Sequence, residues 1–320
     1  EIMINSEILK ECPVCGSSNF INEKIKAPGY QYGINDLSSY CECNECKVLF
    51  QNPRIDPDYI SIYYDNNYYT RSDLCNSNVS KTRKTFYNFI QRVKIIKWKS
   101  QALFDYRFPK NKGRLLDYGA GSGHLLNMLK HNDWKDLWWY DTDSEALKVE
   151  NINKLYDKDI FPLDSSLENT FDYIISNHSL EHIANPIEVL KLWHSLLKPG
   201  GELIVATPNL NSIFFKVFKS FWYFLTPPYH YIIYTPKSLE MALKKTGFEM
   251  KSVEFHSNSQ CLWGSLDLLI QKNRIGSSTP VSMYLNNSSL LSILTKPLIY
   301  VFDVFGLGDN LVLKMTKSSR

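Results

Sequence analysis

The sequence predicts an α/β protein with a doubly wound, mostly parallel sheet, preceded by a small cysteine-rich domain. Three observations predict this class. From residue 112 onward, strand and helix patterns alternate along the chain, which favours a parallel sheet covered by helices. A glycine-rich turn follows the first strand of that series, and such a turn presents the start of a helix to a small ligand. Two C-x-x-C pairs lie upstream, before residue 47.

Length and composition exclude several classes of protein. The chain has 320 residues, with 44% hydrophobic and 22% charged residues, as in soluble globular proteins with a large core. Lys and Arg number 36 against 33 Asp and Glu, so the net charge is only +3, and we expect no nucleic-acid partner. No apolar run reaches the roughly 18 residues of a transmembrane helix. The polar stretch Glu1–Cys12 lacks a signal pattern, so we expect a cytoplasmic protein.

Residues 1–55 predict a zinc-ribbon-like domain. Two C-x-x-C pairs are typical of a tetrahedral four-thiolate zinc site, which is structural because no ligand position stays open. The two pairs lie farther apart than usual, and Cys41 competes for a ligand position. We prefer Cys43 because its spacing to the next cysteine repeats that of the first pair. Buried free thiols are the alternative. The predicted ligands are Cys12, Cys15, Cys43 and Cys46.

Residues 56–110 are interpreted as a connector. Tyrosines gather between Tyr59 and Tyr69, where they either cap a cationic ligand or pack along a domain seam. Apolar residues recur at helical spacing within Ser80–Phe108, which predicts a helix. Pro109–Gly113 breaks this pattern and begins the second domain, predicted over residues 111–320.

The stretch Leu115–Leu126 contains the glycine-rich turn. Arg114–Tyr118 predicts the first strand, which carries Asp117. Three glycines follow at alternate positions, and the next helix is expected from about the second glycine to just before Asp133; the glycines are Gly119, Gly121 and Gly123. The dinucleotide fingerprint G-x-G-x-x-G has its third glycine one residue later. The spacing therefore indicates a nucleotide-like ligand other than a dinucleotide.

The second strand is predicted at Asp136–Tyr140. Asp141 follows it directly, and an acid at this place suits hydrogen bonding to ribose hydroxyls. A helix is predicted over Ser144–Leu155 and a weak third strand over Ile160–Leu163. Asp164 then follows, near an expected adenine.

The fourth strand is predicted at Phe171–His178 and the fifth at Glu202–Thr207. The helix between them is expected to start within Leu180–Pro186. Asn177 and His178 end the fourth strand, at the carboxyl edge where open α/β sheets bind ligands.

Together these motifs resemble the class I S-adenosylmethionine (SAM) methyltransferases. Asp-x-Gly-x-Gly-x-Gly at 117–123, His-x-Leu-Glu-His at 178–182 and Leu-Lys-Pro-Gly-Gly at 197–201 occur in the family's order. The branch they resemble includes ubiquinone-biosynthesis and sugar O-methyltransferases. The resemblance implies a Rossmann-like sheet of seven strands, the last antiparallel. It also implies that SAM binds at Asp117, Gly119, Gly121, Gly123, Asp141 and Asn177.

The cysteine-rich leader resembles that of deoxysugar methyltransferases and related surface-polysaccharide enzymes. This resemblance implies O-methylation (EC 2.1.1.-) of a sugar in a nucleotide-linked, capsule or O-antigen precursor. One alternative acceptor is a lipid-linked or quinone-like small molecule. A SAM-sensing module that binds a protein through its zinc knuckle is an alternative of another class. The oligomeric state stays open.

An aromatic insertion, Asn211–Tyr234, follows the fifth strand. It suits a substrate lid, a core, a dimer face or a helix at a membrane surface, and we favour a lid or core over membrane contact. The remaining elements are predicted as a helix over Thr235–Lys245, strand six over Glu249–His256, a helix over Gln260–Gln271, a helix over Leu290–Phe305 interrupted at Pro297, and a closing antiparallel strand over Asn310–Met315.

Three histidines are candidate catalytic residues. Methyl transfer to a hydroxyl is an in-line displacement that needs good positioning and benefits from a general base, for which histidine suits neutral pH. His178 leads because it follows the fourth strand, with His182 four residues later and His230 on the insertion. Glu181 either orients an imidazole or caps a helix. A structural histidine is the alternative at each place.

Overall fold

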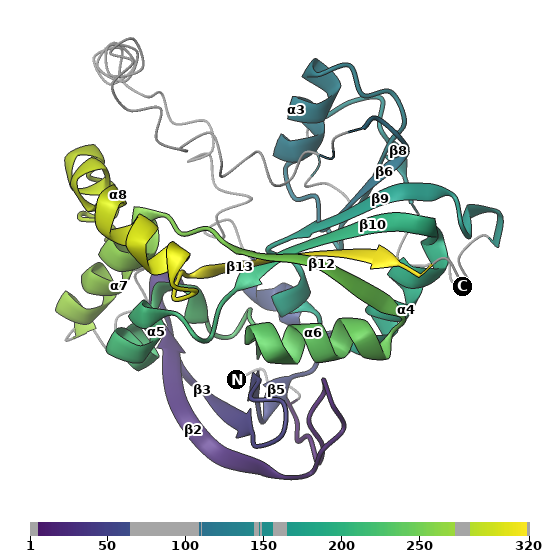
Figure 1. Ribbon diagram of the computed structural model, residues 1–320. Coiled ribbons are helices and arrows are strands. Elements are labelled where there is room, and N and C mark those ends of the chain that lie inside the picture. The colour runs from purple at the N-terminus through teal and green to yellow at the C-terminus, as the bar shows by residue number, and fades with distance from the viewer. Residues whose placement is uncertain are drawn as a thin grey trace.

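The computed structural model describes residues 6–64, 109, 111–143, 147, 149–155, 165–272 and 282–318. Its centre is a seven-stranded sheet with the order β12-β13-β10-β9-β6-β7-β8 (Figure 1). In chain order these strands are β6 (Leu115–Tyr118), β7 (Leu137–Tyr140), β8 (Asn153–Lys154), β9 (Phe171–Asn177), β10 (Leu197–Pro208), β12 (Phe248–Phe255) and β13 (Asn310–Lys317).

The strand directions are those of the predicted class. β6, β7, β8, β9 and β10 pair in parallel, whereas β13 runs antiparallel to both β10 and β12. β13 is buried along most of its length, as expected of an apolar strand inserted between two others. The predicted doubly wound sheet with an antiparallel last strand is confirmed.

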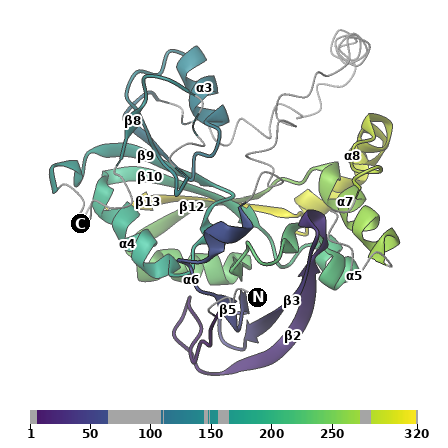
Figure 2. The ribbon, with the colours of Figure 1, turned by 180° about the vertical axis from the view of Figure 1, so that it is seen from behind.

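Helices cover both faces of this sheet (Figures 1 and 2). On one face, α4 (Pro186–Leu196) and α6 (Pro236–Lys245) bury their apolar residues against Leu116, Ile174 and Leu203. On the other face, α3 (His124–His131) packs on Leu115, Ile175 and Ile204. Successive strand residues thus face opposite layers, which the two-residue period of a strand requires.

The helix predicted over Ser144–Leu155 is wrong at its carboxyl end. Asn153–Lys154 forms β8, which pairs with Trp138 and Trp139 of β7. Ile152 and Leu155 belong to the cores on opposite faces of the sheet. An extended chain places residues three apart on opposite faces, whereas a helix would place them on one side. Residues 144–146 and 148, the third strand predicted at 160–163, and Asp164 lie outside the described residues.

The cysteine-rich region forms an antiparallel sheet with the order β11-β4-β3-β2. Its strands are β2 (Phe20–Gly29), β3 (Ile34–Cys43), β4 (Leu49–Gln51) and β11 (Ile232–Ile233), while β1 (Ser6–Glu7) pairs with β5 (Arg54–Ile55). β11 comes from the aromatic insertion, so one sheet joins two segments that are about 180 residues apart in the sequence.

The insertion packs into the core. It contains α5 (Ile213–Phe218) and two 3₁₀ turns, Lys219–Phe221 and Tyr223–Leu225. Its large apolar side chains share one buried cluster with the cysteine-bearing sheet and with α7 (Ser259–Ile270); this cluster includes Ala27, Tyr40, Leu49, Phe214, Phe218, Trp222, Leu225 and Cys261.

The helix predicted over Leu290–Phe305 has nearly the expected bounds but is not interrupted. α8 (Ser289–Val304) continues through Pro297, where an interruption was predicted. Ile299 and Phe302, which follow the proline, pack in the same cluster as α5 and α7. Burial of that following turn supplies a reason for the helix to continue, since an interior proline can bend a helix without ending it. Among the described residues, no helix is long and apolar enough to cross a membrane.

Candidate functional site

The glycine-rich turn between β6 and α3 depends on its glycines. Gly119, Gly121 and Gly123 have φ values of +85°, +51° and +78°, a region that favours glycine. A Cβ on Gly119 would lie 2.3 Å from the Cβ of Ser179, and one on Gly123 would lie 2.5 Å from the Cδ1 of Leu147. The turn therefore needs both the backbone freedom and the close approach that glycine allows.

Asp141 lies against this turn. Its Oδ2 accepts a hydrogen bond from the Gly121 N–H at 2.8 Å, and its Oδ1 accepts one from the Asp143 N–H at 3.0 Å. Burial raises the pKa of Asp141 even though these two bonds favour the carboxylate. Two further predicted ligands lie nearby in the sheet: Asp117 is buried on β6, and Asn177 ends the neighbouring strand β9.

The turn after β9 packs directly on the glycine-rich turn. His178 has a φ of +52°, which is uncommon for a non-glycine residue, and its N–H donates to the Ala206 carbonyl at 2.8 Å. The Ser179 hydroxyl donates to the Tyr118 carbonyl at 2.7 Å. These bonds hold the turn between β6 and β10, and backbone strain of this kind clusters at functional sites. The turn continues into a 3₁₀ helix, Leu180–His182, which is separate from α4.

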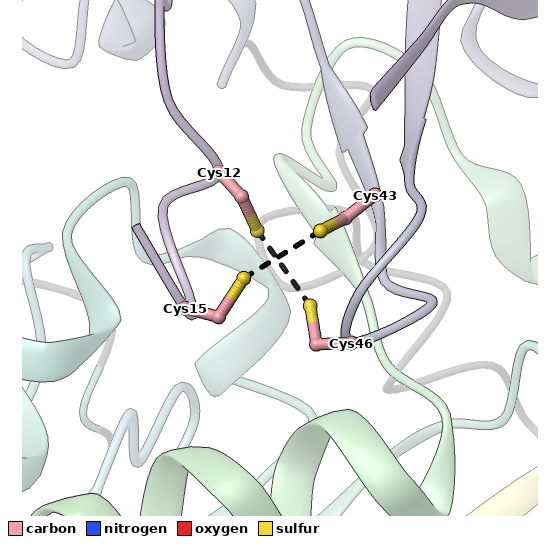
Figure 3. Close-up of side chains that lie close together, drawn as sticks. All are labelled: Cys12, Cys15, Cys43 and Cys46. Atoms are coloured by element: carbon pink, nitrogen blue, oxygen red, sulfur yellow. Dashed lines mark hydrogen bonds between the residues drawn. The ribbon is translucent and has the colours of Figure 1, made fainter. Parts of the chain in front are cut away.

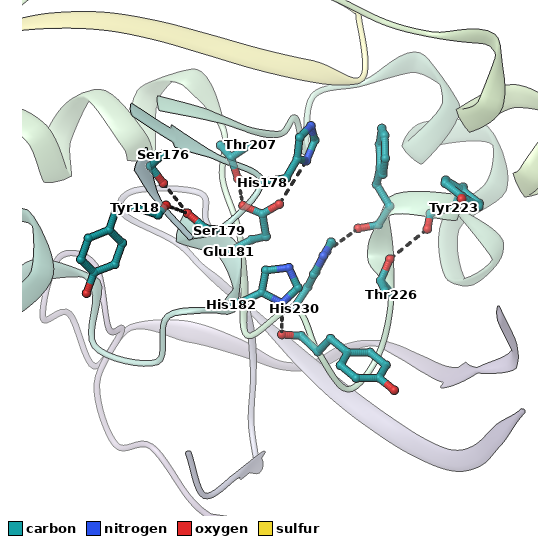
Figure 4. Close-up of polar contacts among 12 residues, drawn as sticks. Tyr118, Ser176, His178, Ser179, Glu181, His182, Thr207, Tyr223, Thr226 and His230 are labelled. Carbon is teal, nitrogen blue, oxygen red and sulfur yellow. Dashed lines mark hydrogen bonds and ion pairs between the residues drawn. The ribbon is translucent and has the colours of Figure 1, made fainter. Parts of the chain in front are cut away.

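Glu181 is fully buried and pairs with His178 (Figure 4). Its Oε1 lies 3.2 Å from the His178 Nδ1, and its Oε2 accepts a hydrogen bond from the Thr207 hydroxyl at 2.9 Å. Burial alone would raise the pKa of Glu181, but the bond to His178 and the charges of the neighbouring histidines lower it to about 2. Glu181 therefore stays ionised and orients His178, which decides between the two roles that the sequence left open.

His182 and His230 face each other, with ring centroids 4.5 Å apart. The Nδ1 of His182 lies 3.1 Å from the Tyr229 carbonyl, and the Nδ1 of His230 lies 2.8 Å from the Phe224 carbonyl. A carbonyl only accepts, so each Nδ1 carries the proton and each Nε2 keeps a lone pair. Burial lowers the pKa of both rings, that of His230 to about 3. Both imidazoles are consequently neutral near pH 7.

The three candidate histidines thus come together, although His230 lies about 50 residues beyond the other two. Two members of the site were missed from the sequence, Thr207 and Tyr229. Thr207 ends a predicted strand at the ligand-binding edge of the sheet, so its position was the available signal. Nothing in the sequence indicated that Tyr229 belongs to the site. Of the tyrosine cluster, Tyr64 contacts the ring of Tyr229, with centroids 5.1 Å apart, whereas Tyr68 and Tyr69 lie outside the described residues.

The four predicted cysteine ligands form one cluster (Figure 3). Sγ–Sγ distances are 3.6 Å for Cys12 and Cys46 and 3.5 Å for Cys15 and Cys43. These distances are far too long for disulfides and close to the roughly 3.8 Å edge of a tetrahedron with Zn–S bonds of about 2.3 Å. The hydrogen bond from Cys46 lowers the pKa of Cys12 to about 5. The cluster fits a four-thiolate zinc site.

Cys41 stands apart from this cluster. It is buried, and its thiol lies 3.6 Å from the Asn22 Oδ1. Cys43, two residues further along β3, belongs to the four-cysteine cluster, whereas Cys41 does not. The preference for Cys43 as the ligand agrees with this arrangement.

Comparisons with known proteins identify similar sequences and structures. A family model described as "Methyltransferase domain" matches residues 89–253, just over half of the chain. A human mitochondrial arginine-hydroxylase is 30% identical over 107 residues, and a ubiquinone biosynthesis O-methyltransferase of Xanthomonas campestris is 29% identical over 104 residues. These alignments cover 32% and 30% of this chain.

The same alignments span only 30% of the human relative and 43% of the bacterial one. Among solved structures, an S-adenosylmethionine-dependent methyltransferase from Mesorhizobium loti has a TM-score of 0.45 and 16% identity, over 68% of this chain and 97% of that one. The fold assignment rests on the strand order of the sheet.

Proposed function

The chain belongs to the methyltransferase-domain family, and from this premise we propose that it transfers the methyl group of SAM to a hydroxyl of a small molecule. One observation carries the proposal. A buried, ionised Glu181 holds His178 at the carboxyl edge of the sheet, and the turn that bears this pair packs on Gly119. His178, the proposed general base, therefore lies beside the turn that the resemblance assigns to SAM.

The residues divide into those that bind SAM and those that act on the acceptor. Asp117, the glycine-rich turn and Asn177 would bind the methionine part, and Asp141 would bind the ribose. When bound, SAM supplies an electrophilic methyl group on a sulfonium. His178 would take the proton from the acceptor hydroxyl as oxygen attacks, and Glu181 would stabilise the imidazolium that results. Neutral His182 and His230 would accept hydrogen bonds from the acceptor.

The acceptor proposed here is a phenolic or quinone-like small molecule. The Xanthomonas relative is named for ubiquinone biosynthesis, and the ring of Phe224 lies beside His178. The Phe224 ring centroid is 5.6 Å from that of His178. Flat apolar walls with a few polar groups suit an aromatic ring. The comparisons do not support the sugar acceptor that the cysteine-rich leader implied, so that acceptor stays an alternative for the same assay.

The decisive experiment is a mass-shift assay with SAM against two panels, one of catechols and hydroxyquinols and one of nucleotide sugars. We expect a single methyl added to a member of the first panel. Methylation of only a nucleotide sugar would reverse the choice of acceptor. Binding of SAM without any methylated product in either panel or in cell extracts would instead favour the SAM-sensing module.

His178→Ala tests the role of the base. Turnover should fall by about 100-fold or more, as expected when a general base is removed, while the Kd for SAM measured by calorimetry should change less than twofold. Asp141→Ala is the matched control, because it should weaken SAM binding instead. Unchanged turnover in His178→Ala would remove His178 from the mechanism.

We also propose that the four-cysteine cluster binds one structural zinc ion. Cys12, Cys15, Cys43 and Cys46 would supply all four ligands, so the metal would stabilise the fold and take no part in methyl transfer. The same cluster is the place where the proposed binding module would meet a protein partner.

A further inference from the structure

The loop that carries His230 is fixed by a pair of residues in the cysteine-bearing sheet. We infer that Gln51 and Tyr40 are positioning residues for His230. The hairpin of β3 and β4, whose turn carries Cys43 and Cys46, would thereby set the geometry of the acceptor site. The inference rests on the proposed function, in which His230 contacts the acceptor. Gln51 and Tyr40 lie outside the seven-stranded sheet that resembles the methyltransferases.

Gln51 and Tyr40 together form what we call the clamp, and Gln51 makes most of its hydrogen bonds. Its side chain is 1% exposed, and its Nε2 donates to the Pro228 carbonyl at 2.8 Å and to the His230 carbonyl at 3.0 Å. Its backbone N–H also donates to the Tyr231 carbonyl at 2.9 Å. One residue therefore holds the backbone before, at and after His230.

Tyr40 is the second half. It is fully buried, and its hydroxyl lies 3.2 Å from the His230 carbonyl and 3.1 Å from the Gln51 Nε2. Burial raises the pKa of Tyr40, so the phenol keeps its proton and can donate. The carbonyl of His230 thus has both Gln51 and Tyr40 as donors, which leaves little freedom for the loop.

The turn that carries Cys43 and Cys46, called the knuckle below, brings Tyr40 and Gln51 together. Tyr40 on β3 and Gln51 on β4 are cross-strand partners in the sheet. The turn between the strands runs from Cys43 to Cys46, and it is closed by hydrogen bonds from Lys47 N–H to the Cys43 carbonyl and from Cys43 N–H to the Val48 carbonyl, both at 3.0 Å. Two thiolates on one metal would hold this hairpin in register.

The opposite side of the His230 loop is held by the turn after β9, which carries His178, Glu181 and His182. The Tyr231 N–H donates to the Glu181 carbonyl at 2.9 Å, and the His182 Nδ1 donates to the Tyr229 carbonyl at 3.1 Å. The His230 loop therefore lies between the cysteine-bearing sheet and the turn that carries the proposed base. A shift of the sheet would move His230 relative to His182 while leaving the glycine-rich turn in place.

Gln51→Met tests the clamp, because it keeps the side-chain length and removes the amide. Asn52→Leu is the matched control. Asn52 is also a buried carboxamide of this region and also bonds the backbone, with its Nδ2 donating to the Leu9 carbonyl at 3.0 Å and its Oδ1 accepting from the Leu9 N–H at 2.9 Å. It holds the Leu9 segment instead of His230. Tyr40→Phe is a milder second variant that removes only a hydroxyl.

The first readout is the ¹⁵N spectrum of the histidine side chains in the full-length protein, with the His230 signals assigned by His230→Gln. The wild type should show the Nδ1-protonated tautomer for His230. Gln51→Met should lose most of that tautomer, Tyr40→Phe should lose part of it, and Asn52→Leu should retain it. An unchanged His230 spectrum in a folded Gln51→Met, or an equal change in Asn52→Leu, would overturn the inference. This readout requires no acceptor, so it is independent of the proposed reaction.

The second readout follows the metal and the reaction. Chelation of the metal should alter the His230 signals in the same direction as Gln51→Met, and a folded, metal-free protein with an unaltered His230 spectrum would contradict the link to the knuckle. With the acceptor found by the mass-shift assay, Gln51→Met should lower kcat/KM by about 10- to 100-fold, a loss typical of a misplaced group. The Kd for SAM should stay within twofold of the wild type.

Discussion

At the scale of single residues, the chemistry of the candidate site depends on which of its buried side chains carry a charge. Glu181 is ionised because its hydrogen bond to His178 favours the carboxylate, and His182 and His230 are neutral because burial disfavours their charged forms. Each histidine also has a carbonyl acceptor that selects its tautomer. The result is one anionic and two neutral hydrogen-bonding groups around His178, an arrangement suited to receiving a proton.

The lowered histidine pKa values predict a loss of stability in mild acid. In the unfolded chain a histidine has a pKa near 6.5, whereas that of His230 in the folded protein is about 3. Between these values the unfolded state binds the proton and the folded state does not, so stability is present above pH 6.5 and falls as the pH drops toward 3. The slope should approach about 1.4 kcal/mol per pH unit for His230, and the lowered pKa of His182 acts in the same direction.

The check is urea unfolding of the wild type and of His230→Gln between pH 7 and pH 5. Over this range the curve of the variant should be flatter. Equal slopes for the two proteins would show that His230 does not titrate differently in the folded and unfolded states.

At the scale of elements, the glycine-rich turn was the most predictable part of the site. Its spacing indicated a ligand other than a dinucleotide. The structure explains all three glycines by their positive φ values, and Gly119 and Gly123 also by close neighbours. The carboxyl end of the helix predicted after β7 was wrong, because Asn153–Lys154 forms a strand there. Ile152 and Leu155 fit a helical pattern in isolation, and only packing on the two faces of the sheet makes them part of a strand.

Gly119→Ala should weaken SAM binding by about 10-fold or more, because the new methyl group meets Ser179 and the backbone has a φ of +85°. Gly16→Ala is the matched control. Gly16 has a similar φ of +82°, but a Cβ there would have no neighbour within 4 Å. Calorimetry with SAM should separate the two variants. Equal affinities would show that the contact with Ser179 does not shape the ligand site.

At the scale of the whole molecule, the cysteine-bearing sheet and the aromatic insertion form one unit. β11 of the insertion pairs with β4, and the aromatic residues of both segments share one core. The proposed zinc site is therefore expected to stabilise both segments, the cysteine-rich leader and the insertion.

Metal analysis of the purified protein should find about one zinc per chain. Cys46→Ser should lose the metal and lower the melting temperature by several degrees, because a structural metal contributes directly to folding. Cys41→Ser should keep both the metal and the melting temperature, since Cys41 lies outside the cluster. A metal-free wild type purified without chelators would rule out the zinc site.

The sequence by itself determined the sheet class, the glycine-rich turn and the four clustered cysteines, because each depends on local spacing: hydrophobic periods, alternate glycines and paired thiols. The tertiary structure alone decided what the aromatic insertion does. Its residues carry no motif, and their role comes from contacts with segments far away in the chain, namely Gln51 and Tyr40 on one side and Glu181 and His182 on the other. Those contacts require the folded core, which brings His230 to His182 across about 50 residues of sequence.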